Sequence, residues 1–285
     1  MQENNKQKGA LLRQAIALAI ILVMIIILCV LWFAPNGTLG WLANNRNADA
    51  GGLDISVSGG ALEFGDVIKV LPDIAGTKID TIYYVFSKEA NAYCLVQADN
   101  KEGALTPAGK IDGKDYYYSR GDDGKPVPIN LTGLFPSEKL TITLTFRNTT
   151  SKSVGYSLSL SDFDDSDGKF TIEKGEGNTA GTYSVMGIFK VKLDSITSEG
   201  GNPVYKAGEH DGEYLANYDT TNGTYTKTGD PFDIVTGTIA PEDDVTCTFS
   251  ISVDLTQYSQ LSGTVTNLLS KKALSIGALR LSRTS

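Results

Sequence analysis

The sequence predicts an all-β chain, a jelly-roll-like antiparallel β-sandwich, preceded by one N-terminal transmembrane helix. Two observations predict this class: a charge-free apolar run near the N-terminus and, from Leu53 onward, runs in which apolar and polar residues alternate with period two. Clusters of Gly, Asp, Asn and Ser separate these runs, which is typical of short strands joined by turns. We therefore divide the chain into a basic tail (1–14), a helix (15–34), a linker (35–52) and a β-sandwich domain (53–285).

The predicted helix extends from Ala15 to Ala34, and its twenty residues carry no charge. At the rise of an α-helix they span about 30 Å, the thickness of the hydrocarbon layer of a membrane. Trp32 and Phe33 occupy the place of an interfacial aromatic pair near its end. The run is longer than the apolar part of most secretory signals, which favours a signal-anchor embedded in membrane lipid.

Basic residues set the predicted orientation of this helix. Lys6, Lys8 and Arg13 precede it, against one acidic residue, Glu3. The positive-inside rule then keeps the tail in the cytoplasm and places the β domain outside the cell, as a single-pass membrane protein. An alternative is that the leader is cleaved and the domain is secreted to the cell surface.

A second alternative for the N-terminus is a pilin-like subunit. Lys8-Gly9 followed by an apolar helix resembles a type IV pilin leader. Gln14, however, stands at the fifth mature position, where pilins carry glutamate, and Pro35 ends the helix early.

The clearest predicted strand is 245–255, in which every second residue from Val245 to Leu255 is apolar and the residues between them are Thr, Ser or Asp. A second, from Leu140 to Phe146, alternates apolar residues with Thr. This pattern indicates strands with one buried and one solvated face. Weaker runs predict strands at 55–57, 82–86, 93–96, 156–160, 183–193, 234–239 and 274–281.

Composition excludes several function classes. The chain has 33 acidic and 25 basic residues and a net charge of −8, which argues against a nucleic-acid partner. Its only histidine, His210, lies in the loop sequence Gly208-Glu-His-Asp-Gly212. One histidine excludes multi-histidine zinc sites and most histidine-based catalysis, so we expect a non-enzymatic protein.

An acidic loop is the candidate metal site. Asp162, Asp164, Asp165 and Asp167 follow a predicted strand, and carboxylate oxygens at this density can hold Ca²⁺. The register does not fit an EF-hand, because Gly168 at the sixth position would make Phe163 the first ligand. The alternatives are a calcium site of another kind or a solvated acidic turn without a cofactor.

Cys94 and Cys247 are the cysteines of the predicted extracellular domain, where a disulfide is permitted. The alternation places Cys247 on the inward face of its strand, and Cys94 on the same face as Val96. They are therefore either a core disulfide or two buried free thiols, and we favour the thiols.

Tyrosines gather at Tyr116–Tyr118 and recur at Tyr205, Tyr214, Tyr218 and Tyr225. They could present a contact surface for a glycan or a protein. Tyrosine is also an ordinary residue on a half-buried strand, and we favour that interpretation.

Three segments carry a resemblance to a known family. The apolar leader runs into Thr38-Leu-Gly-Trp41-Leu-Ala-Asn-Asn-Arg-Asn-Ala-Asp-Ala-Gly-Gly-Leu53-Asp-Ile-Ser-Val57, which resembles the start of camelysin/TasA-type surface and biofilm-matrix proteins of Gram-positive bacteria. Pro136-Ser-Glu-Lys-Leu-Thr-Ile-Thr-Leu-Thr-Phe-Arg-Asn148 and the strand after Pro241 resemble later segments of that family. The departures are a longer, more apolar leader, Leu42 in place of an aromatic residue, and inserted regions near 100–130 and 196–232.

The resemblance implies a jelly roll on the cell surface, with a structural or adhesive role. In some members of the family it implies matrix fibres in which an N-terminal strand passes to the next subunit. For this chain, strand exchange would involve Leu53, Ile55 and Val57, and the partner would be a second copy or another matrix protein. The family also implies a metal-dependent peptidase as an alternative, which would need zinc or calcium ligands from carboxylates and His210.

Overall fold

The computed structural model describes residues 54–58, 60–73, 80–88, 92–98, 105–118, 129–132, 138–172, 180–200, 203–219, 221–258 and 272–284. The predicted tail, helix and linker lie outside these residues, and so do Ala15, Trp32, Phe33, Ala34 and Leu53. Within the described part, no helix is long and apolar enough to cross a membrane.

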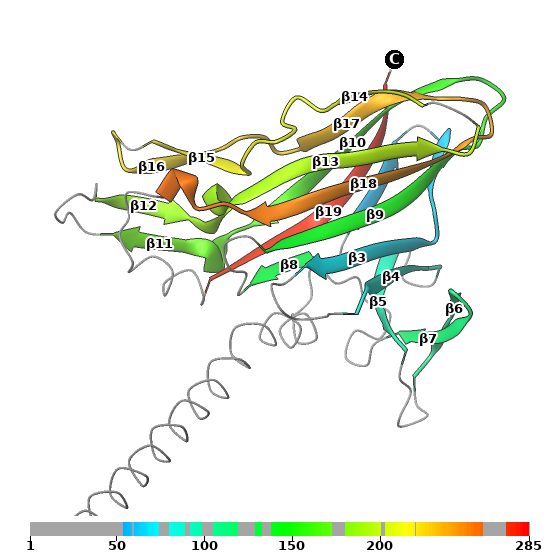
Figure 1. Cartoon of the computed structure of the whole chain (residues 1–285), viewed down its shortest axis with the longest axis horizontal. Helices are drawn as coiled ribbons and strands as arrows, with labels where there is room; N and C mark the ends of the chain where they lie inside the picture. Colours follow the sequence, from blue (N-terminus) through cyan, green and yellow to red (C-terminus); the bar gives the residue numbers. More distant parts are fainter. Residues whose placement is uncertain are drawn as a thin grey trace, which may run out of the picture.

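The described chain is all-β with antiparallel sheets, as the alternation predicts. One sheet has nine strands: β2 (Leu62–Phe64), β3 (Val67–Asp73), β4 (Ile82–Ser87), β5 (Ala92–Gln97), β6 (Pro107–Ile111), β7 (Lys114–Tyr118), β9 (Lys139–Asn148), β13 (Phe189–Ser198) and β18 (Asp244–Val253). Their order is β13-β18-β9-β3-β4-β5-β7-β6, with β2 beside β9. Figure 1 shows β13, β18 and β9 running alongside one another through the body.

The second large sheet has six strands: β1 (Asp54–Ser58), β8 (Ile129–Thr132), β10 (Val154–Asp164), β14 (Val204–Ala207), β17 (Phe232–Ile239) and β19 (Ala273–Thr284). Their order is β1-β19-β10-β17-β14, and β8 also pairs with β19. The β1–β19 pair is parallel, whereas the other pairs of the described sheets are antiparallel.

Smaller elements complete one end of the body. The hairpins are β11 (Lys169–Ile172) with β12 (Gly181–Ser184), and β15 (Ala216–Asp219) with β16 (Thr224–Lys227). Three short 3₁₀ turns are η1 (Ser166–Gly168), η2 (Val185–Ile188) and η3 (Thr256–Tyr258). Figure 1 shows both hairpins at the end of the body away from the β6–β7 hairpin.

The core lies between the two large sheets. Alternate residues of β9 and β18 are buried, which confirms the inward faces that the sequence predicts. They share one cluster with buried residues of β10 and β19, such as Leu158 and Leu279. Phe146 of β9 meets Tyr156 of β10 edge to face, with ring centroids 4.8 Å apart, so aromatic contact joins the sheets directly.

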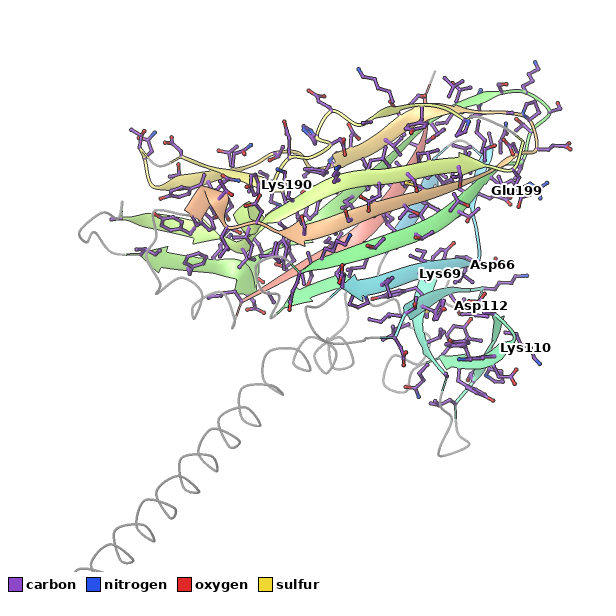
Figure 2. All side chains as sticks on the ribbon, viewed as in Figure 1. Asp66, Lys69, Lys110, Asp112, Lys190 and Glu199 are labelled. Atoms are coloured by element: carbon purple, nitrogen blue, oxygen red, sulfur yellow. The ribbon has the colours of Figure 1, made fainter. Side chains whose placement is uncertain are left out.

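A second, smaller apolar cluster lies beneath the β6–β7 hairpin. Val85, Val96 and Ile111 are buried together there. The hairpin turns at Asp112-Gly113, and both residues have positive φ (51° and 81°), as a two-residue primed turn requires. Figure 2 shows Asp112 near Lys69 of β3, and their charged groups lie 3.6 Å apart. The β6–β7 end of the nine-stranded sheet therefore curls back over the outer face of the same sheet, toward β3.

Candidate functional site

The candidate site is the outer edge of β19, which two short strands share. β8 pairs antiparallel with Ala273–Ile276, and β1 pairs parallel with Ala278–Ser282. Gly277 lies between the two paired stretches. The edge of the sheet is therefore completed in two pieces, one from the middle of the chain and one from the first described strand.

Only residues 59–61 separate β1 in one sheet from β2 in the other. Gly60 has a φ of +62°, which favours glycine, and a Cβ there would meet no atom within 4 Å. Ala61 is buried, and its carbonyl accepts hydrogen bonds from Thr149 N (3.0 Å) and Thr149 Oγ1 (3.3 Å). The body of the protein is thus fixed from Ala61 onward, and β1 is attached to it by a short glycine link.

The register places the residues predicted for strand exchange opposite the core leucines of β19. Ile55 pairs with Leu279 and Val57 with Leu281, and both leucines are fully buried. Leu53 lies outside the described residues. The pairing therefore brings Ile55 and Val57, two of the three predicted residues, to this edge. Their positions are in register with the inward-facing leucines of β19.

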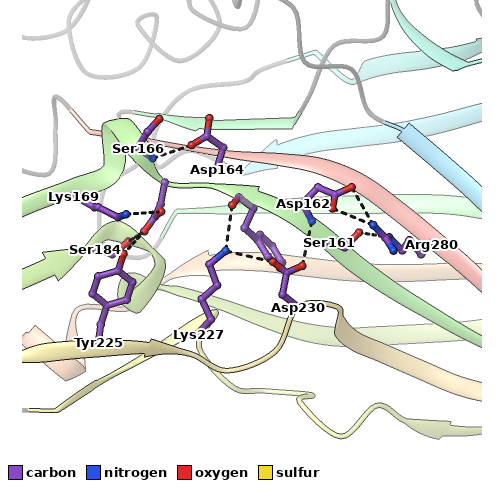
Figure 3. Close-up of polar contacts among 12 residues, drawn as sticks. Ser161, Asp162, Asp164, Ser166, Lys169, Ser184, Tyr225, Lys227, Asp230 and Arg280 are labelled. Atoms are coloured by element: carbon purple, nitrogen blue, oxygen red, sulfur yellow. Dashed lines mark hydrogen bonds and ion pairs between the residues drawn. The ribbon is translucent and has the colours of Figure 1, made fainter.

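Arg280, between these leucines, faces the other side of the sheet. Its Nε donates to Ser161 Oγ (2.6 Å), and its Nη2 donates to both carboxylate oxygens of Asp162 (3.0 and 3.2 Å) (Figure 3). Asp162 also has a positive φ of 57°. This bidentate ion pair holds β19 to β10 directly behind the segment that β1 covers.

The acidic loop does not converge on one point. Asp162 pairs with Arg280, while Asp164 Oδ1 accepts a hydrogen bond from the backbone of Ser166 (2.9 Å), which lowers the pKa of Asp164. Asp165 is buried, and its Oδ2 accepts hydrogen bonds from Ser184 Oγ (2.7 Å) and Tyr225 Oη (2.8 Å). Lys169 Nζ lies 3.6 Å from Asp165 Oδ1. Figure 3 shows Lys169, Ser184 and Tyr225 converging from different elements.

Asp167 is exposed on η1. Among the described residues, no group of three or more His, Cys, Asp or Glu side chains lies close enough together to hold a metal ion. The calcium site stays a prediction. His210 Nδ1 lies 3.3 Å from Glu213 Oε2, and its ring packs 5.2 Å from Phe232, so it belongs to a loop beside the six-stranded sheet.

The disulfide between Cys94 and Cys247, one of the two predicted alternatives, does not form. Cys94 and Cys247 are both buried free thiols. Cys94 lies on β5 and Cys247 on β18, and three strands of the same sheet lie between them. At about 4.8 Å per strand they are much farther apart than a disulfide allows. Burial raises the pKa of the Cys247 thiol to about 12, so it acts as a small apolar residue.

The tyrosines have separate roles. Tyr116 and Tyr118 pack over the small cluster beneath the β6–β7 hairpin. Tyr218 stacks on Tyr183 (4.2 Å) in the end hairpins, and Tyr258 meets both rings edge to face. Tyr205 instead is 46% exposed, at the edge strand β14.

Sequence reasoning missed the roles of Arg280, Ser184 and Tyr225, because the spacing of polar residues along a strand does not reveal partners from another strand. An isolated arginine within the apolar alternation of 274–281 is the signal that could have identified Arg280. Comparisons of the chain with protein-family models, curated proteins and solved structures found no match. The function is therefore argued from the chain itself.

Asp243, in the turn between β17 and β18, makes stability depend on pH through its contacts with the end of β13. Its pKa is lowered, first by the hydroxyl of Ser198 and then by the backbone N–H groups of Gly200 and Asp244, which donate to it. A lowered folded-state pKa gives stability that is present above the unfolded value, about 3.9, and is lost as pH falls through the folded value.

We expect Asp243→Asn to flatten the loss of unfolding free energy between about pH 5 and 2, measured by denaturant titration. Ser198→Ala should act in the same direction, because it removes the largest cause of the shift. Unchanged acid dependence in both variants would contradict this assignment.

Proposed function

We propose that the protein is a structural or adhesive cell-surface protein, with a jelly-roll-like β-sandwich, that assembles by strand exchange at the outer edge of β19. The observation that carries the proposal is β1, the first strand of the described residues: it has five residues, lies at the edge of the sheet parallel to β19, and is joined to the body by three residues. A terminal edge strand can leave its own sheet and add to that of a second copy without unfolding the core.

The backbone of β1 does not distinguish its own β19 from the β19 of another copy. Parallel pairing of 54–58 with 278–282 uses main-chain groups, and the buried leucines of β19 offer the same two rows to either strand. The link at 59–61 would act as the hinge, since domain swapping exchanges an element through the loop that joins it to the body. The products would be open chains of subunits, because each copy gives one strand and accepts another.

The resemblance to camelysin/TasA-type proteins supports the same proposal, together with a signal-anchor at 15–34 or a cleaved leader. In this proposal the β domain lies outside the cell, and copies become matrix subunits when they exchange strands. The negative net charge and the single histidine also favour a structural over a catalytic role.

The test locks β1 to its own sheet. Ser58 lies opposite Ser282, so a Ser58→Cys, Ser282→Cys double variant should form an internal disulfide on oxidation. We expect the oxidised full-length protein to form no fibres by electron microscopy and the reduced protein to form them. The variants are made in a Cys29→Ser background, and Cys94 and Cys247 are buried and should not interfere.

Ser282→Cys alone is the matched control and should assemble in both redox states. Fibres from the oxidised double variant, with the disulfide verified by mass spectrometry, would overturn the exchange of β1. Absence of fibres from the natural protein in every condition would overturn the assembly itself.

A further inference from the structure

The other edge of the six-stranded sheet, β14, is a second place where strands can be added. β14 pairs with β17 alone, and Figure 1 shows it at the rim of the body. Val204 is 72% exposed and Tyr205 is 46% exposed. They are two of the three exposed large apolar side chains among the described residues, the third being Leu71 of β3. As neighbours on a strand they lie on opposite faces of the sheet, so each face of this edge exposes one apolar side chain.

β13, the edge strand of the nine-stranded sheet, differs from β14 because another segment of the chain covers it. Along β13, Val191 N donates to Glu213 O (3.1 Å), Leu215 N donates to Phe189 O (2.9 Å), and Leu193 N donates to Asp211 Oδ1 (2.6 Å). The segment 211–215 therefore covers that edge. Along β14, within the described chain, no segment pairs on the side away from β17. Lys206 is the only charged residue of β14.

β14 is tied to its neighbour directly after it ends. Gly208 N donates to Ile234 O of β17 (2.8 Å). An ordered edge pays less conformational entropy when another strand adds to it.

Tyr205 also has a glycine as its neighbour on β17. It lies opposite Gly237 of β17, and Gly237 lies opposite Tyr156 of β10. The three residues form one lateral row. A Cβ on Gly237 would come 2.8 Å from the Tyr156 ring, so glycine is required there. The ring of Tyr156 therefore fills the space that a side chain at 237 would take, on the face of the sheet that Tyr205 shares.

We propose that β14 pairs antiparallel with β14 of a second copy, about a two-fold axis that passes beside Tyr205. A two-fold axis that joins two antiparallel edges must be perpendicular to the sheet, so it keeps each side chain on its own face. Because side chains alternate between faces, only registers in which a residue lies opposite itself are allowed.

The two-fold axis can pass beside either of the two middle residues of β14, Tyr205 or Lys206, and the charge of Lys206 decides between these registers. Centring on Lys206 would place two lysines opposite one another, which is destabilising. Centring on Tyr205 pairs the two tyrosines on one face and places each Val204 opposite the lysine of the other copy on the other face. The apolar stem of that lysine then covers the exposed valine. The contact is closed by symmetry and gives a dimer, unlike the open chains expected from β1.

Cysteine cross-linking tests this register in the full-length protein, in detergent and in a Cys29→Ser background. Tyr205→Cys should form a disulfide-linked dimer on mild oxidation, because residue 205 lies opposite itself. Leu71→Cys is the matched control, since Leu71 is also 46% exposed, and it should stay monomeric on a denaturing gel. Equal cross-linking of the two variants would overturn the proposal.

Charge variants give a readout that folding defects do not mimic. Val204→Lys would face Lys206 of the second copy, so we expect at least a tenfold weaker dimer by sedimentation. Val204→Glu would face the same lysine with opposite charge and should hold the dimer at least as well as the natural residue.

The glutamate variant should also dimerise more tightly than the lysine variant when β1 is locked by the 58–282 disulfide. Because the locked strand cannot exchange, this result would separate the β14 contact from strand exchange. Equal weakening by lysine and glutamate would show that Lys206 is not opposite, and would overturn the register. A natural protein that stays monomeric at every concentration would overturn the dimer.

Discussion

Phe249→Asp is expected to remove most of the stability of the β domain. Phe249 is fully buried on β18, between Ile142 of β9 and Leu193 of β13. No cation faces it in these pairs, so the carboxylate would be buried without a partner. The cost is several kcal/mol, against a net stability of about 5–15 kcal/mol for a whole domain. Denaturant unfolding followed by circular dichroism measures the loss.

Thr248→Asp, one residue away, is the matched control. Thr248 faces outward and is half-buried, opposite Thr143, and the two hydroxyls lie 3.2 Å apart. We expect a loss of about 1 kcal/mol, the value of one exchanged hydrogen bond. Similar losses for both variants would mean that the inward face of β18 has been assigned wrongly.

Asn148→Asp is expected to have the second largest effect. Asn148 is fully buried at the end of β9, and its Nδ2 donates to the carbonyls of Lys152 (2.7 Å) and Ala240 (2.9 Å). Its Oδ1 accepts from Thr150 N (2.9 Å) and Thr150 Oγ1 (2.8 Å). The substitution keeps the size of the side chain but replaces the donor with a buried negative charge that faces carbonyl oxygens.

We expect this variant to lose about 3 kcal/mol or more of unfolding free energy at pH 7, from the buried charge and the carbonyls left without a donor. The loss should shrink toward pH 4, where the carboxyl can enter the fold protonated. Asn217→Asp is the control: Asn217 is exposed and donates one hydrogen bond, to Thr228 Oγ1 (3.2 Å). Equal losses would contradict a structural role for Asn148.

Strands with strict alternation could be predicted from the sequence. The runs at 140–146 and 245–255 correspond to β9 and β18, and those at 82–86 and 274–281 correspond to β4 and β19. β3 was not predicted, because the adjacent apolar pairs Val67-Ile68 and Val70-Leu71 obscure its alternation. The inserted regions contain the β6–β7 and β15–β16 hairpins, whose turn residues hid short strands.

One predicted strand proved to be three elements. The run 183–193 includes the end of β12, the turn η2 and the start of β13. Ser184 Oγ accepts a hydrogen bond from Met186 N (3.2 Å) and caps the turn, and Gly187 leaves room for the hydroxyl of Tyr258. The first is a local cap and the second a tertiary contact, and alternation alone reports neither.

The candidate site could be predicted only in part. Ile55 and Val57 were identified as a first strand, but its parallel pairing with β19 depends on which strands meet in space. The contacts of the buried Asp165 could not be predicted either. The acidic loop predicted either a calcium site or a solvated acidic turn. The partners of its buried member, the hydroxyl groups of Ser184 and Tyr225, come from other strands and could not be read from the loop.

The division of the β19 edge between β8 and β1 also has a mechanical consequence. The chain enters β1 at Asp54, opposite Ala278, in the middle of the edge and next to the place that β8 occupies. A pull on the preceding chain cannot run straight along the edge, because β8 lies in line with it. Tension therefore peels β1 from the Asp54 end, one residue pair after another, instead of shearing all five pairs at once. A strand loaded in this way yields at a lower force than one that is loaded in shear.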